Sequence, residues 1–302
     1  MPEDTALIAD GGLATELEAR GHDLSDALWS ARLLVEAPQE ITAVHMSFFR
    51  AGAMIATTAS YQASFEALAA RGIGRDETIR LLRRSVELAS GARAKADIAD
   101  GEAGRSGSST KQRWVAASVG PYGALLADGS EYRGRYGLSV AQLEDWHRPR
   151  LEALADAGAD VLALETIPDA DEAEALVNVV RSLGVPAWLS YTIDGLRTRA
   201  GQPLADAFAV AAGVPEIVAV GVNCCAPTDV LAAIEPAGDT GKPVIVYPNS
   251  GERWDAARRT WVGQPRFSPR LAAEWVLAGA RVVGGCCRVR PADIAELSAA
   301  LA

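Results

Sequence analysis

Four cysteines in two adjacent pairs carry the most distinctive chemistry of this sequence. The pairs are Cys224 with Cys225 and Cys286 with Cys287. Cysteine thiolates bind zinc at about 2.3 Å in tetrahedral sites, and catalytic zinc has three protein ligands and one open position. A secreted disulfide framework would scatter its cysteines through a small loop-rich domain, and a disulfide between sequence neighbours is strained. We therefore predict a metal site or catalytic thiols in a reducing compartment.

Eight apolar runs, each followed by a helix-like stretch, must position these cysteines. Val- and Ile-rich runs of this length are typical of strands buried on both faces of a parallel sheet. The runs span residues 6–12, 54–60, 114–120, 161–167, 187–193, 218–224, 244–250 and 282–287. The alternation predicts an α/β protein, a single (β/α)8 TIM barrel over residues 1–302. A doubly wound open sheet is the alternative, but no GxGxxG motif follows the first run.

Helix start and stop signals support this alternation. They frame the stretches 143–160, 169–184 and 268–280, each with apolar residues at helical spacing. The polar, Gly- and Ser-rich residues 100–112 predict an exposed loop before the third strand.

The carboxyl ends of the strands form the active-site face of such a barrel. All four cysteines fall on this face, at the ends of the sixth and eighth strands, and Gly284 with Gly285 supplies backbone freedom for a turn. One cysteine from the sixth strand and two from the eighth would make a three-thiolate site. Further candidate groups at the same ends are Asp10, Gly11, Gly12, Glu165, Asn223 and Asn249.

Simpler roles exist for several of these groups. Asp10 could be a turn residue before two glycines, Glu165 a helix cap, and Asn249 part of an ordinary turn. Tyr122 and Trp254 lie near strand-end loops, where an aromatic face could attract a sulfonium cation or could simply be core.

Composition narrows the class of partner. The 302 residues include 29 Lys+Arg and 39 Asp+Glu, a net charge of −10, which argues against a nucleic-acid partner. Hydrophobic residues make up 49% and charged residues 23%, which excludes a disordered or fibrous chain. The first residues lack a secretory signal pattern, and no run approaches the length of a membrane span. We expect a cytoplasmic protein with small-molecule partners and no membrane partner.

The strand-end strings resemble the homocysteine S-methyltransferase family, zinc-dependent enzymes built on a (β/α)8 barrel. The matching strings span nearly the whole chain and include DGGLATELEARG, TTASYQAS, SVGPYGALLADGSEYRG, LALETIPDADEAEAL, VGVNCCAP, VIVYPNSGERWD and VGGCCRVRPADI. GVNC together with GGCC is the most specific part. The chain is most similar to the short single-domain type of bacteria and plants, which uses S-methylmethionine, and often S-adenosylmethionine, as the methyl donor.

The resemblance implies a Zn²⁺ cofactor and a set of site residues. The implied zinc ligands are Cys224, Cys286 and Cys287. Cys225 has no ligand role in the family pattern and is expected to pack beside the site. The resemblance further implies that the homocysteine amino group is recognised by Asp10 and Glu165, with backbone donors around Gly11 and Gly12 near its carboxylate. Asn223 and Asn249 are expected to line the same mouth.

Some positions depart from the family pattern, and other functions stay open. Ala59, Val289 and Asp293 differ from the usual residues and bear on donor choice. Betaine, or another thiol or selenol acceptor, is an alternative within the family. A zinc hydrolase would normally use His ligands, but the 3 His are not at strand ends. A non-catalytic zinc-thiolate protein would use Cys225 as a fourth ligand.

Overall fold

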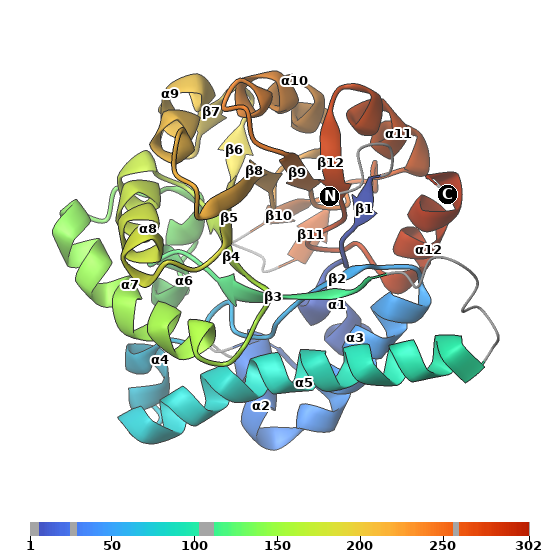
Figure 1. The fold of residues 1–302 in the computed structure, drawn as a ribbon, viewed down its shortest axis with the longest axis horizontal. Coiled ribbons are helices and arrows are strands. Elements are labelled where there is room, and N and C mark those ends of the chain that lie inside the picture. Colours follow the sequence, from blue (N-terminus) through green and yellow to red (C-terminus); the bar gives the residue numbers. More distant parts are fainter. Residues whose placement is uncertain (1–5, 25–28, 103–111, 256–259, 302) are drawn as a thin grey trace.

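Eight parallel strands form a closed barrel in the computed structural model, which describes residues 6–24, 29–102, 112–255 and 260–301. The strands are β1 (Leu7–Ile8), β2 (Ile55–Thr57), β3 (Trp114–Val119), β4 (Val161–Ile167), β5 (Ala187–Tyr191), β8 (Ile217–Asn223), β9 (Val244–Tyr247) and β12 (Ala280–Val283). Their order around the sheet is β1-β12-β9-β8-β5-β4-β3-β2 (Figure 1). A parallel bridge between Ala9 and Ile55 joins the two ends. Each predicted run overlaps one of these strands, so the barrel is confirmed and the open sheet is excluded.

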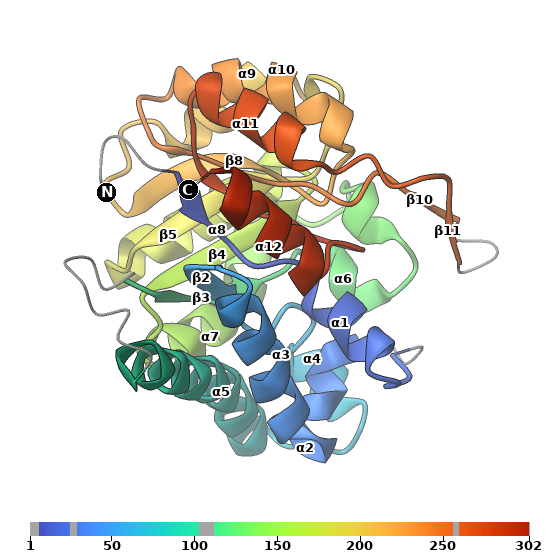
Figure 2. The ribbon, with the colours of Figure 1, turned by 90° about the vertical axis from the view of Figure 1, so that its right-hand side faces the viewer.

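Helices wrap the outside of the barrel (Figures 1 and 2). The longer ones are α3 (Pro38–Arg50), α5 (Arg75–Glu102), α7 (Val140–Ala155), α8 (Ala170–Leu183), α10 (Pro227–Gly238), α11 (Pro269–Leu277) and α12 (Pro291–Ala300). Shorter helices are α1 (Leu13–Ala19), α2 (Leu33–Glu36), α4 (Phe65–Ala69), α6 (Gly123–Leu126) and α9 (Leu204–Phe208), with single 3₁₀ turns at Trp29–Arg32, Ser130–Tyr132 and Ala209–Ala211. None of the described helices is both long and apolar enough to cross a bilayer.

Two antiparallel hairpins extend the strand-end loops. One pairs β6 (Ile193–Asp194) with β7 (Arg197–Thr198), and the other pairs β10 (Arg253–Asp255) with β11 (Thr260–Val262). The second hairpin projects from the body of the barrel, at the right of Figure 2.

Local sequence signals set the ends of α8 where they were predicted, whereas the helix predicted within 143–160 is α7, which begins earlier at Val140 and ends at Ala155. The Asp169 carboxylate accepts a hydrogen bond from the Asp171 amide at 3.2 Å and begins α8, while Gly184 ends this helix with a φ of 64°. The prediction for residues 100–112 was wrong in part, because α5 continues to Glu102. Residues 103–111 lie outside the described residues.

The barrel interior is filled by alternating small and large side chains. Three positions on β3, β4 and β8 are alanines, and the space they leave accommodates Trp188 from β5 and Tyr247 from β9. The Trp188 indole N–H donates to the Tyr247 hydroxyl at 2.9 Å. Because the interior is packed in this way, ligands bind at the strand ends rather than inside the barrel. Tyr247 lies at this boundary and lines the cavity described below.

Gly221 on β8 provides a test of how tightly the barrel closes. A Cβ at this position would lie 1.7 Å from the Ile245 carbonyl oxygen on β9, so the two backbones would have to separate. We expect Gly221→Ala to lower the free energy of unfolding by about 3 kcal/mol or more. The control is Gly238→Ala in α10, where the nearest atom to a Cβ is 4.0 Å away. It should change stability by less than about 1 kcal/mol. Urea unfolding of both variants measures the difference, and equal effects would contradict the packing argument.

Candidate functional site

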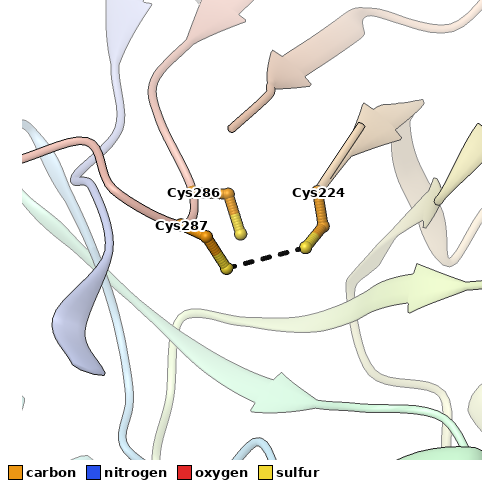
Figure 3. A group of neighbouring side chains, drawn as sticks. All are labelled: Cys224, Cys286 and Cys287. Atoms are coloured by element: carbon orange, nitrogen blue, oxygen red, sulfur yellow. Dashed lines mark hydrogen bonds between the residues drawn. The ribbon is translucent and has the colours of Figure 1, made fainter. Parts of the chain in front are cut away.

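Three cysteine sulfurs from two strand ends meet at the carboxyl face of the barrel. Cys224 follows β8, and Cys286 and Cys287 follow β12 (Figure 3). Their sulfur atoms lie within 4.8 Å of one another, and the Cys224 and Cys287 sulfurs are 3.8 Å apart. Two sulfurs bound at about 2.3 Å to one tetrahedral ion are separated by about 3.8 Å. The cluster therefore has the spacing of a metal site.

Backbone geometry turns the cysteines toward each other. Cys224 has a φ of 50°, a left-handed conformation that ends the strand and redirects its side chain. The Cys286 amide donates to the Pro248 carbonyl at 2.8 Å, and the Cys287 amide donates to the Asn249 Oδ1 at 3.1 Å. The loop after β9 thus holds the loop after β12 in place.

The two glycines before Cys286 act differently from the expectation. Neither Gly284 nor Gly285 has a positive φ, so backbone freedom is not the requirement. A Cβ on Gly284 would lie 2.7 Å from the Ala9 Cβ, and one on Gly285 would lie 2.2 Å from a Val289 methyl carbon. These positions need glycine because neighbouring segments pack directly against the backbone.

Electrostatics in the cluster favour a bound cation. Hydrogen bonds from the neighbouring thiols hold the pKa of Cys224 well below its usual range. Hydrogen bonding to Cys224, burial and the Cys224 charge raise the pKa of Cys286 and of Cys287, so further thiolates in the same space are disfavoured. A divalent cation removes this repulsion and allows all three thiols to ionise.

Cys225 lies apart from the cluster. It is 1% exposed and packs in the main hydrophobic core. Burial and the nearby Cys224 charge raise the pKa of its thiol. The described structure gives Cys225 the environment of a small apolar residue.

A cavity of about 120 Å³ opens beside the cysteine cluster. It is lined by residues from β1, β2, β3, β4, β9 and the loops that follow them, together with the three cysteines. Among its lining residues are Asp10, Gly11, Gly12, Thr15, Thr57, Thr58, Tyr61, Gln62, Ser118, Tyr132, Glu165, Thr166 and Tyr247. The structure therefore brings Asp10, Glu165 and the glycines to the same space as the sulfurs.

Asp10 and Glu165 supply two buried carboxyl groups to this cavity. The Asp10 carboxylate accepts from the Thr57 amide at 2.8 Å and from the Thr57 hydroxyl at 3.0 Å. Burial outweighs these bonds and raises the pKa of Asp10 to about 8. Glu165 accepts a hydrogen bond from Ser118, and burial raises its pKa to about 7. Such groups are poised to pair with a buried cation, which would restore their charged forms.

The glycines after β1 lie against the cysteine loop. A Cβ on Gly11 would lie 2.6 Å from the Val289 carbonyl oxygen, and one on Gly12 would lie 2.6 Å from the Cys286 carbonyl oxygen. The Gly12 amide already donates to the Val289 carbonyl at 2.9 Å. The predicted donation to a substrate carboxylate is therefore not open to Gly12 in this geometry.

The two predicted asparagines hold backbone beside the site and are not among the cavity-lining residues. The Asn223 side chain accepts from the Thr166 amide at 2.7 Å and donates to the Thr166 hydroxyl at 2.8 Å. These bonds fix Thr166 at a φ of 59°, next to Glu165. Asn249 fixes the Cys287 amide as described above. Direct substrate contact by either residue stays a prediction.

Tyr132 is a site residue that the sequence analysis missed. It ends the 3₁₀ turn Ser130–Tyr132, and its hydroxyl lies 3.2 Å from the Cys224 sulfur. Tyr122, which was considered instead, packs against Trp146 and Tyr136 with ring centroids 5.0 and 5.2 Å away. The side chain of Trp254 lies outside the described residues. The signal that could have found Tyr132 is the polar SEY string in a strand-end loop.

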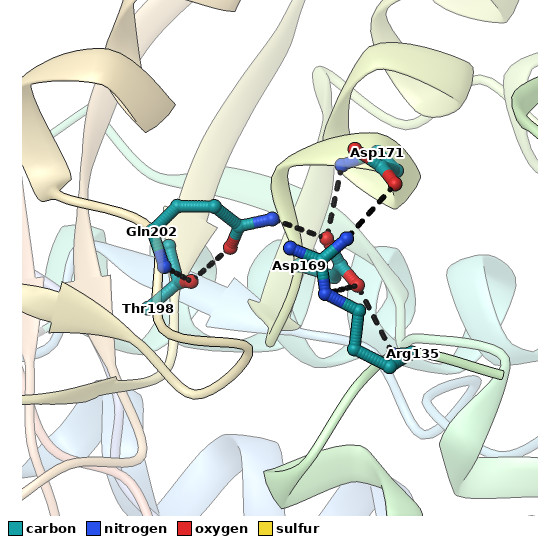
Figure 4. A network of polar contacts seen from close by, with 5 residues as sticks. All are labelled: Arg135, Asp169, Asp171, Thr198 and Gln202. Carbon is teal, nitrogen blue, oxygen red and sulfur yellow. Dashed lines mark hydrogen bonds and ion pairs between the residues drawn. The ribbon is translucent and has the colours of Figure 1, made fainter.

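A polar network ties the loops around the site together (Figure 4). The Asp169 carboxylate accepts from the Arg135 amide at 3.0 Å and from the Gln202 side-chain amide at 2.6 Å. Gln202 in turn bonds to Thr198 in the β6–β7 hairpin. One carboxylate thus joins the loops that follow β3, β4 and β5. The rim of the site is preorganised by these bonds.

The arrangement places the chain in a class of proteins, barrel enzymes that gather cysteine sulfur at the carboxyl ends of their strands. Comparison with known proteins identifies the family within that class. The homocysteine S-methyltransferase family model matches residues 7–301. The chain therefore belongs to the homocysteine S-methyltransferase family.

Individual relatives agree with this membership over nearly the full chain. The chain is 48% identical to the homocysteine S-methyltransferase of Escherichia coli, with 99% of this chain and 96% of the relative covered. It is 44% identical to the homocysteine S-methyltransferase YbgG of Bacillus subtilis, with 97% and 93% covered. The crystal structure of the metallated form of the homocysteine methyltransferase MmuM from Escherichia coli superposes with a TM-score of 0.87 at 45% identity. That match covers 98% of this chain and 96% of the other.

The raised pKa of Asp10 predicts a pH dependence of stability. Its pKa rises from 3.8 to about 8 on folding, so between these values the folded chain binds more protons than the unfolded chain. The free energy of unfolding of the metal-free protein should therefore fall as the pH rises through this range. We expect Asp10→Asn to flatten the slope, measured by urea unfolding from about pH 5 to about pH 9. Asp194→Asn, at an exposed hairpin position, should keep the wild-type slope. A variant and control with the same slope would refute the assignment.

Proposed function

We propose that the protein is a zinc-dependent homocysteine S-methyltransferase. It transfers a methyl group from a sulfonium donor, S-methylmethionine or S-adenosylmethionine, to the thiol of L-homocysteine and produces methionine. The single barrel domain of residues 1–302 binds both substrates. The observation that carries the proposal is that Cys224, Cys286 and Cys287 share one cavity with the carboxyl groups of Asp10 and Glu165.

The sulfur cluster fits zinc as its metal. Thiolates are soft ligands that suit zinc, and three of them leave one tetrahedral position for a substrate sulfur. The 3.8 Å separation of the Cys224 and Cys287 sulfurs supports the same coordination. A bound zinc supplies the positive charge that keeps a coordinated thiol deprotonated at neutral pH.

The carboxyl groups hold the amino-acid end of homocysteine. Its ammonium pairs with Asp10 and Glu165, which are 3% and 7% exposed. Thr57 and Ser118 orient these carboxylates through the hydrogen bonds described above. Charge-assisted bonds in a water-poor pocket are strong and directional. They fix the distance between the ammonium and the sulfur that reacts.

The transfer itself needs no base from the protein. A lone pair on the homocysteine sulfur forms the new bond to the methyl carbon. The old bond from carbon to the sulfonium sulfur breaks, and its electrons leave a neutral thioether. The two sulfurs and the carbon must lie in line, with about 3 to 3.5 Å between the reacting atoms. The thiol proton passes to solvent water before this step, so the overall reaction releases one proton and needs no histidine in the cavity.

Two other functions fit the geometry less well. A zinc hydrolase would place histidines around the metal, but His45 and His147 are fully buried outside the cavity. A zinc-storage protein would need Cys225 as a fourth ligand, and Cys225 packs in the hydrophobic core instead. An assay with different methyl donors distinguishes betaine from the sulfonium donors.

A donor panel tests the proposed reaction. Purified zinc-loaded protein is incubated with homocysteine and one of S-methylmethionine, S-adenosylmethionine, betaine or methyltetrahydrofolate. Methionine is then measured by mass spectrometry. We expect product with the sulfonium donors. Product with betaine alone would replace the donor class, and no product with any donor would overturn the proposal.

Cysteine substitutions test the zinc site separately. We expect Cys224→Ser and Cys286→Ser to lose bound zinc and to lower methylation by about 100-fold or more. The control is Cys225→Ala, which should keep the zinc content and activity close to wild type because its side chain lies in the core. A strong chelator should abolish activity, and added zinc should restore it. Wild-type activity in Cys286→Ser would contradict the ligand set.

A further inference from the structure

Two charged side chains next to Tyr132 each have a buried polar atom with no hydrogen-bond partner. Glu131 is 9% exposed, and its Oε2 is buried with no hydrogen-bond partner. The Arg199 guanidinium carbon lies 5.9 Å from the centre of the Tyr132 ring, and its buried Nε also has no partner. Arg133, in the same loop as Glu131, pairs with Asp128 at 3.2 Å. Glu131 and Arg199 therefore present opposite charges with unused hydrogen-bonding atoms.

Both side chains lie next to the place of methyl transfer. Tyr132 lines the cavity, and its hydroxyl contacts the Cys224 sulfur at 3.2 Å. Glu131 directly precedes Tyr132 in the 3₁₀ turn Ser130–Tyr132 and is itself buried. Arg199 reaches the same residue from the loop after β7, where its guanidinium lies over the Tyr132 ring. The pair thus borders the side of the cluster where Tyr132 sits.

The loops that carry the pair are fixed to each other. Thr198 and Gln202 bond to each other on either side of Arg199, and the Gln202 amide donates to Asp169 at 2.6 Å. The same carboxylate accepts from the Arg135 amide in the loop that contains Glu131 (Figure 4). The loops that carry the two charged groups are therefore joined before any ligand binds.

Unpartnered buried polar atoms are costly and require an explanation, such as a ligand. A ligand with both an ammonium and a carboxylate would satisfy Glu131 and Arg199 together. The ammonium of homocysteine is already matched by Asp10 and Glu165. The sulfonium donors of the proposed function bring a second ammonium, together with a carboxylate on the same carbon.

We infer that Glu131 and Arg199 bind the α-amino-acid end of the methyl donor, with the ammonium on Glu131 and the carboxylate on Arg199. This inference rests on the proposed function. Tyr132 adjoins Glu131 in the chain and Arg199 in space, and its aromatic ring lines the cavity, where it attracts the sulfonium cation. The site thus selects donors that are amino acids, on top of the requirement for a sulfonium.

Three donors that differ only in their charged ends test the inference. S-methylmethionine has both ends, dimethylsulfoniopropionate has the carboxylate alone, and trimethylsulfonium has neither. The variants are Glu131→Gln and Arg199→Gln. The controls are Asp194→Asn and Arg197→Gln, which remove the same charges from exposed positions of the neighbouring hairpin.

The expected results separate the two contacts. Arg199→Gln should raise the KM for S-methylmethionine and dimethylsulfoniopropionate by about 10- to 100-fold, and Glu131→Gln should do so for S-methylmethionine alone. Neither should change the rate with trimethylsulfonium or the KM for homocysteine by more than about twofold, and both controls should match wild type. Bound zinc should be unchanged. Equal losses with all three donors, or a raised KM for homocysteine, would overturn the inference.

Direct binding distinguishes failure of this inference from failure of the proposed function. Calorimetry measures the dissociation constant of S-methylmethionine on the zinc-loaded protein without homocysteine. We expect binding to the wild type and a loss of about 10-fold or more in each variant. If the wild type forms methionine but the variants bind and react like the controls, only the inference is overturned. If the wild type binds S-methylmethionine through these residues but forms no methionine, the proposed reaction fails, while Glu131 and Arg199 are still supported as contacts of the amino-acid end. A wild type that does not bind S-methylmethionine overturns the inference.

Discussion

The close packing of three cysteine sulfurs, which would repel one another as thiolates, is the constraint on which the site depends. Cys224, Cys286 and Cys287 are held within 4.8 Å by backbone bonds and by close contacts at glycines, so they cannot move apart when they ionise. The structure around them is built to impose this proximity. Asn249 positions the Cys287 amide, and the left-handed turn at Cys224 directs its sulfur inward. A divalent cation between the three sulfurs would offset the repulsion that their enforced proximity creates when they ionise.

The same logic extends to the carboxyl groups and to the rim. Asp10 and Glu165 are both buried carboxyl groups. Glu131 is buried and Arg199 is partly buried, and each has a buried polar atom with no hydrogen-bond partner. Burying these groups lowers the free energy of unfolding, and the large packed core of the barrel offsets this loss. A ligand that pairs with these side chains would remove several of these unfavourable free-energy contributions at once. Binding energy of this kind can be directed to aligning the two reacting sulfurs.

Sequence reasoning reached most of the fold and the centre of the site for identifiable reasons. Buried parallel strands appear as apolar runs, and the carboxyl ends of these runs locate Cys224, Asp10 and Glu165 on one face. Periodicity does not give side-chain direction after a strand ends, so Asn223 was expected in the cavity although it turns toward Thr166. It also does not describe irregular loops. Tyr132 reaches the cluster from a single 3₁₀ turn, whose position depends on contacts far away in sequence.

Hydrogen bonds also join the loops that follow the first and eighth barrel strands, β1 and β12. The Gly285 amide donates to the Asp10 carbonyl, and the Gly12 amide donates to the Val289 carbonyl, both at 2.9 Å. Residues from the two ends of the chain thus share one pocket wall. During synthesis, Asp10 leaves the ribosome long before Cys286, so the pocket cannot assemble on a partial chain. A ribosome that stalls before the eighth strand would release a polypeptide with a nearly complete barrel but without Cys286 and Cys287, two of the three sulfurs of the cluster.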